Sequence, residues 1–147
     1  MIPRCLKLSS GIALSLALSN CVHQNVRQVS PGFSESRIAA SKTIYVRKHG
    51  EDDYKLGEEI AAQLQEMGYK ASVGTSQSPI GKADATLSYT DHWMWDITMY
   101  MISLDMQLRE PGSDMIIASA KTTRSSLARK SQKEMVRETL TKLLKNQ

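Results

Sequence analysis

Cysteine is scarce in this sequence, and long apolar runs are missing from it. Its two cysteines, Cys5 and Cys21, both lie near the start, which excludes a zinc finger, an iron–sulfur cluster and a disulfide framework. No apolar run reaches the roughly 18 residues that a membrane-spanning helix needs, so we exclude an integral channel or transporter. The length of 147 residues and the 41% hydrophobic content instead predict one ordinary globular domain.

Motifs for catalysis and metal binding are missing as well. The sequence contains no nucleophile elbow, no glycine-rich phosphate loop and no HExxH motif. His92 could form a dyad with Asp91 or Asp96, but a lone histidine on a strand is usually a solvated side chain. No spaced set of His, Asp and Glu reaches three metal ligands. We therefore expect no enzyme activity, no cofactor and no metal.

The first 20 residues have the pattern of a signal peptide. Arg4 and Lys7 form a basic n-region, and residues 8–18 form an apolar h-region of 11 residues. Residues 18–21, Leu-Ser-Asn-Cys, then resemble the lipobox of bacterial lipoproteins, although Asn20 stands where Gly or Ala is usual. The alternative is a plain secretory signal followed by an incidental cysteine.

The resemblance to lipoproteins implies that Cys21 receives a lipid after residues 1–20 are removed. Each buried methylene of an acyl chain adds about 0.8 kcal/mol, so several chains give a stable anchor. Val22, rather than Asp, follows the cysteine, which implies sorting to the outer membrane with the domain in the periplasm. Because exported proteins do not meet chromosomal DNA, we expect no nucleic-acid partner.

Polar residues dominate the segment that follows Cys21. Residues 22–42 include Ser30-Pro31-Gly32 and show no sustained periodicity, which predicts that 21–42 comprise the lipidated cysteine and a flexible tether. The folded part is then a single domain over 43–147, which is long enough for one core.

Alternating strand and helix patterns predict an α+β domain over 43–147. We expect strands at 43–47 and 69–73, on either side of an amphipathic helix with an apolar stripe at Leu56, Ile60, Leu64 and Met67. Residues 83–90 and 102–109 alternate with a period of two but with opposite parity, so a bend, bulge or tight turn lies near 96–98. A turn at 110–113 leads to a strand at 115–123, and Ser131 with Glu134 matches the capping box of a last helix.

The expected order is therefore β-α-β-β-β-α, or β-α-β-β-β-β-α with one further short strand. Helices near both ends and hairpins between them favour a largely antiparallel sheet with both helices on one face. The other face of such a sheet remains open to water or to a partner.

Both tryptophans of the chain, Trp93 and Trp95, lie in the segment 90–100. Two residues apart on a strand, they share one face. In one interpretation both pack under the helices with Tyr89; in the other, Trp93, Trp95 and Tyr100 form a surface platform beside Asp96 for a partner or a glycan. Core aromatic residues are the commoner case, so we favour burial of at least one tryptophan. Exposed aromatic rings would mark an interaction site.

The residues Tyr89, Trp93, Trp95-Asp96 and Tyr100, behind a lipobox, resemble a family of small, uncharacterised lipoproteins of Gram-negative bacteria. That family carries a tryptophan-aspartate-aromatic signature in a mid-domain hairpin, and the resemblance implies no known activity. The coarse topology also resembles envelope accessory domains, such as those of lipoproteins that activate cell-wall synthases or assist secretion.

Positive charge is concentrated towards the end of the chain. Residues 121–147 contain eight basic and two acidic residues, whereas 21–120 contain nine basic and thirteen acidic ones. We favour a solvated helix face that is partly paired with the acidic helix over 51–66. The alternative is a basic surface for anionic lipid, lipopolysaccharide or peptidoglycan.

These patterns predict a lipid-anchored accessory protein of the cell envelope that binds another envelope protein. The candidate contact residues are Trp93, Trp95, Asp96 and Tyr100, and Cys21 is the lipidation site. A lipoprotein that binds a glycan or lipid in an aromatic site is the alternative, and a hydrolase that uses His92 comes last.

Overall fold

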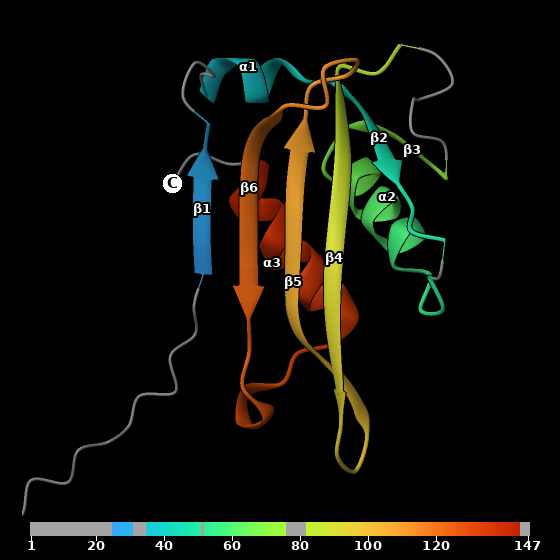
Figure 1. Ribbon diagram of the computed structural model, residues 1–147, viewed down its shortest axis with the longest axis vertical. Coiled ribbons are helices and arrows are strands. Elements are labelled where there is room, and N and C mark those ends of the chain that lie inside the picture. The colour runs from blue at the N-terminus through green and yellow to red at the C-terminus, as the bar shows by residue number, and fades with distance from the viewer. Residues whose placement is uncertain (1–24, 31–34, 51, 76–81, 145–147) are drawn as a thin grey trace, which may run out of the picture.

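A six-stranded mixed sheet organises the α+β domain (Figure 1). The computed structural model describes residues 25–30, 35–50, 52–75 and 82–144. The strands are β1 (Asn25–Val29), β2 (Thr43–Arg47), β3 (Lys70–Gly74), β4 (Ala85–Trp95), β5 (Met99–Arg109) and β6 (Ile116–Thr123). They lie side by side in the order β1-β6-β5-β4-β2-β3. β2 pairs in parallel with β3 and with β4, whereas the other three neighbouring pairs are antiparallel.

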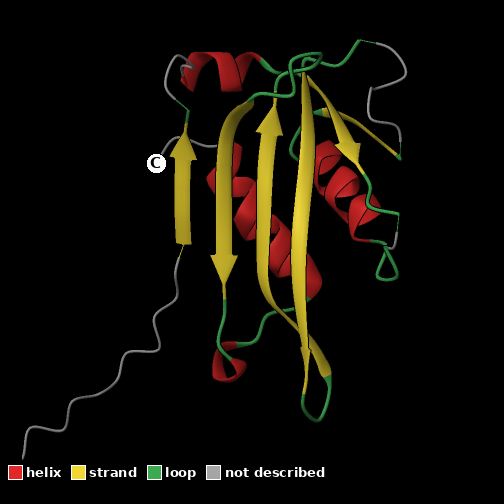
Figure 2. Ribbon diagram, viewed as in Figure 1, coloured by secondary structure: helices red, strands yellow, loops and turns green. Residues whose placement is uncertain are grey.

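Two helices, α2 (Leu56–Glu66) and α3 (Gln132–Leu144), cover one face of this sheet, as Figure 2 shows. Their buried side chains meet those of β2, β4, β5 and β6 in a single core. From β2 onwards the order is β-α-β-β-β-β-α, which confirms the predicted fold class and the longer of the two predicted orders. Within the described ranges, no helix has the length and apolar character needed to cross a membrane.

The helix boundaries follow from capping interactions. The Asp52 carboxylate accepts hydrogen bonds from the backbone N–H groups of Leu56 at 2.7 Å and Gly57 at 2.8 Å, at the start of α2. Gly68, at φ 92°, follows the end of that helix. At α3, Ser131 Oγ accepts from the Glu134 N–H at 3.3 Å, and Glu134 Oε2 accepts from the Ser131 N–H at 2.9 Å. The predicted capping box is thereby confirmed.

The predicted flexible tether is wrong for 25–29 and 35–40, which form β1 and the helix α1 (Glu35–Ala40). β1 pairs antiparallel with β6 at the edge of the sheet. Arg27 donates to both carboxylate oxygens of Glu35, at 2.6 and 2.7 Å, and Ile38 of α1 enters the core. An edge strand needs few apolar residues, and α1 reaches the core through Ile38. The polar composition of 22–42 therefore gave no signal for either element. Residues 1–24, including the predicted signal and Cys21, lie outside the described residues.

The predicted change of parity between 83–90 and 102–109 is confirmed. The register of the β4–β5 pair shifts between His92 and Trp93, and a turn over 96–98 joins the two strands. One extra residue reverses the alternation of a strand. The core-facing side chains therefore have odd numbers in β4 and even numbers in β5 beyond the shift. At the turn between β5 and β6, Arg109 and Asp114 form an ion pair at 3.2 Å. The two residues are not register partners, because Arg109 lies opposite Ile116.

Candidate functional site

The β4–β5 hairpin extends beyond the helices at one end of the domain (Figure 1). It contains the four residues that the sequence singles out, Trp93, Trp95, Asp96 and Tyr100. The structure places each of the four in a different environment.

Trp93 is half-buried against the core. Its ring stacks on that of Tyr54 with 4.0 Å between the centroids and 22° between the planes. Its indole N–H donates to Asp91 Oδ2 at 2.5 Å, which satisfies the polar end of the ring. Trp93 therefore has a structural role, although it is partly rather than fully buried, so the expected burial of at least one tryptophan is met only in part.

Tyr100 is buried, so it contributes no exposed ring, and the predicted platform of three exposed aromatics is wrong in this respect. The Arg129 guanidinium lies 4.0 Å from the centroid of the Tyr100 ring. The same guanidinium donates to Asp96 and, at 3.1 Å, to Thr98. Arg129 thus connects the loop before α3 to the turn of the hairpin and covers Tyr100.

Asp96 shapes the turn itself. Its Oδ1 accepts from the backbone N–H of Ile97, and its Oδ2 forms an ion pair with Arg129. The hydrogen bond from Ile97, against the effect of desolvation, holds the pKa of Asp96 below its ordinary value, and Arg129 adds to this. The carboxylate is therefore ionised and already paired, so it serves the turn rather than a ligand.

Trp95 and its apolar neighbours are exposed. We call the set Met94, Trp95, Ile97 and Met99 the hairpin tip; the exposed fractions are 50%, 69%, 89% and 48%. Leu127, in the short 3₁₀ helix η1 (Ser126–Ala128), is 88% exposed and lies two residues before Arg129, which bonds to the turn. Several exposed apolar side chains gathered at one end of a hairpin in this way indicate an interaction site.

Three residues of the hairpin tip, Met94, Ile97 and Met99, were not among the predicted contact residues. Met94 and Met99 resemble core residues in the sequence, because they are apolar and flank the expected turn, and Ile97 lies in that turn itself. The signal in the sequence was their position next to the Asp96 turn. A hairpin that extends beyond the helices has no helix to cover the side chains near its turn.

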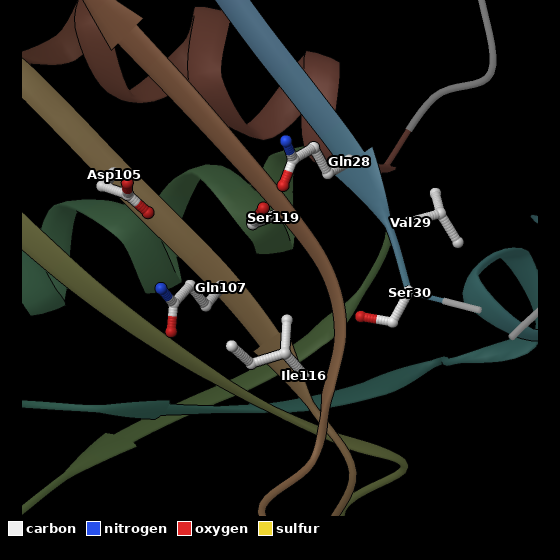
Figure 3. A pocket seen from close by; sticks show the side chains of 7 residues that line it. All are labelled: Gln28, Val29, Ser30, Asp105, Gln107, Ile116 and Ser119. Carbon is white, nitrogen blue, oxygen red and sulfur yellow. The ribbon is translucent and has the colours of Figure 1, made fainter. Parts of the chain in front are cut away.

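The opposite face of the sheet carries a second feature, a polar hollow of about 590 Å³ (Figure 3). It is lined by residues of β1, β5 and β6 and of the segments beside them, namely Gln28, Val29, Ser30, Asp105, Gln107, Ile116 and Ser119. Burial raises the pKa of Asp105, and Lys121, its register partner on β6, opposes this. Oδ1 of Asp105 is buried and has no hydrogen-bond partner in the described part of the chain.

The basic residues near the end of the chain are largely paired. Glu138 accepts from Arg124, Lys130 and Lys142, and Glu66 of α2 pairs with Arg137 of α3. This agrees with the interpretation of a charge face partly paired with the acidic helix. His92 is exposed on β4, and no group of three or more His, Cys, Asp or Glu gathers at metal-binding distance among the residues with described positions.

Comparison with known proteins supports the fold alone. No family model matches the chain, and no curated protein matches its sequence. The PelC dodecamer from Paraburkholderia phytofirmans has a similar structure, with 14% sequence identity and a TM-score of 0.58 over 85% of this chain and 100% of that one. A variant of the same PelC dodecamer matches at 13% identity and a TM-score of 0.59, over 86% and 100% of the two chains. The chain described here therefore shares its fold with PelC.

Proposed function

We propose that this protein is a lipid-anchored, non-catalytic accessory protein of the cell envelope, attached through Cys21 to the outer membrane and facing the periplasm. Its domain binds a second envelope component through the hairpin tip. A protein is the expected partner of such an accessory protein, and a glycan or a lipid is the alternative. The exposed hairpin tip carries this proposal, because four apolar side chains in a single β-turn region contribute little to the core and leave a surface free for contact.

The anchor is tested first, with the two cysteines of the chain as a matched pair. Cys21→Ser should abolish incorporation of labelled fatty acid and release the protein from the membrane fraction. Cys5→Ser lies within the predicted signal peptide and should change neither result. Fatty-acid labelling and membrane attachment that survive Cys21→Ser would refute the anchor.

The contact surface is tested with exposed apolar residues at opposite ends of the sheet. Met115 is 52% exposed in the turn between β5 and β6, so Met115→Ser is the control for Trp95→Ser with Ile97→Ser. In cells that lack the native gene, the double variant should accumulate normally but fail to complement. The control should complement fully. Complementation by the double variant would remove the hairpin tip as the contact surface.

A further inference from the structure

We propose that the hairpin tip binds the lipid bilayer itself and gives the domain a second membrane contact beside its N-terminal lipid. This inference rests on the proposed function, since it names the envelope component that the same surface meets. Three observations support it: the position at which the chain enters the domain, the reach of the hairpin, and the charge balance of the tip.

The chain enters the sheet from the end at which the hairpin projects. Asn25, the first residue of β1, pairs with Thr122 of β6, and Thr122 pairs with Leu104 of β5. Leu104 in turn pairs with Asp91 of β4. Asn25 and Asp91 are therefore at the same level along the strands. Beyond that level β4 continues towards its turn, in the direction from which β1 comes (Figure 1).

The reach of the hairpin matches the reach of the anchor. Trp95 lies four residues beyond Asp91, or about 13 Å along the strand, and the turn adds a few more ångströms. Cys21 precedes Asn25 by four residues, which span at most about 14 Å. With the strands perpendicular to the membrane, a lipid on Cys21 at the surface therefore lets the hairpin tip reach that surface or slightly below it. An interfacial segment penetrates by a similar depth, about 5–10 Å into the boundary of head groups and acyl chains.

The composition of the tip suits that boundary. Trp95 combines a large apolar ring with an N–H donor, and tryptophan is enriched at membrane interfaces for this reason. Asp96 is the one acidic residue in 94–100, and its ion pair with Arg129 cancels its charge. Leu127 adds an exposed apolar side chain from η1, next to this ion pair along the chain. The surface is thus apolar and locally neutral, so entry into the interface exposes no unpaired charge to lipid.

The two tryptophans make a direct test with the full, lipidated chain. In Trp93→Phe, Trp95 is the one remaining tryptophan; in Trp95→Phe, Trp93 remains, half-buried on Tyr54. Each protein is reconstituted in vesicles of phosphatidylethanolamine and phosphatidylglycerol, with and without bromine on the acyl chains. We expect bromine to quench Trp95 and leave Trp93 nearly unchanged. Trp95 emission should also shift to shorter wavelength on reconstitution, with stronger quenching from bromines near the head groups than near the bilayer centre.

Absence of Trp95 quenching, or equal quenching of both tryptophans, would overturn the inference. A photocrosslinker at position 95 in cells separates the alternatives: capture of one protein or a second copy of this chain, without quenching by lipid, overturns the bilayer contact but keeps the proposed function. Mass spectrometry of Cys21 in the same preparation reports on the anchor. An unmodified cysteine overturns the proposed function, and the membrane contact with it.

Discussion

The ion-pair cluster around Glu138 leads us to expect that Glu138→Gln destabilises the domain in a pH-dependent way. Lys130 and Lys142 donate to the carboxylate at 2.8 and 2.7 Å, and Arg124 donates to both of its oxygens. The side chain of Arg124 is only 5% exposed, and that of Glu138 19%. Burial alone would raise the pKa of Glu138, but hydrogen bonds from Lys130, Lys142 and Arg124 outweigh it and lower the pKa from 4.5 to about 2.

The size and sign of the effect follow from linkage. A pKa that is about 2.5 lower in the folded state corresponds to about 3 kcal/mol at pH 7. Solvent screening around the more exposed Lys130 reduces this to about 2 kcal/mol. Because the folded-state pKa is lowered, the stabilisation is complete above the unfolded value of about 4.5 and disappears as the pH falls towards 2. Glu138→Gln also leaves the buried Arg124 cation without its counter-charge.

Urea denaturation of wild type and Glu138→Gln at pH 7, 5 and 3 measures this effect. The difference in the free energy of unfolding should be about 2 kcal/mol at pH 7 and should shrink clearly by pH 3. Glu66→Gln is the matched control, because Glu66 also pairs with cations but is 49% exposed, and it should cost less than about 1 kcal/mol. The linkage reasoning would be refuted if wild type and Glu138→Gln had the same free energy of unfolding at pH 7. It would also be refuted if their difference were equal at all three pH values.

Three further variants test other parts of the structure. Gly57→Ala should lower the free energy of unfolding by about 1 kcal/mol in urea, despite the helix propensity of alanine, because the new Cβ would lie 3.0 Å from Tyr89 Oη. Trp95→Ala should leave the free energy of thermal unfolding within about 0.5 kcal/mol of the wild-type value. Trp93→Ala should lower it by at least about 1 kcal/mol, because the stack on Tyr54 is lost. Equal losses in the two variants would contradict the two environments. Asp105→Asn should stabilise the domain at pH 7 and have no effect below pH 3, because burial raises the pKa of Asp105 in the folded state; the test is a pH series of melting curves.

The elements with strong local signals could be predicted from the sequence. The apolar stripe of α2 and the capping box at Ser131 and Glu134 are local patterns, and each gives its helix with almost the observed boundaries. The reversed parity on either side of 96–98 likewise required a bulge or turn. Such features depend on neighbours within a few positions along the chain, so a single sequence contains them.

Features that depend on distant partners could not be predicted. β1 becomes a strand because β6, almost a hundred residues later, offers it an edge. The parallel pairing of β2 with both β3 and β4 depends on how α2 packs back on the sheet. At the candidate site, the segment was predicted, but which of its residues are exposed was not. Tyr100 is covered by Arg129, and no local sequence pattern connects these two residues. Met94 and Ile97 are exposed because the hairpin extends beyond α2 and α3.

The pairing of β1 with β6 has a mechanical consequence. Any tension that reaches the domain through the residues before Asn25 acts along β1, parallel to its axis. The hydrogen bonds of this antiparallel ladder lie perpendicular to the strands, so all five residue pairs share the load in shear. Peeling would break the pairs one after another at a much lower force. A pull on the N-terminal end therefore has to break all five pairs together before β1 leaves the sheet.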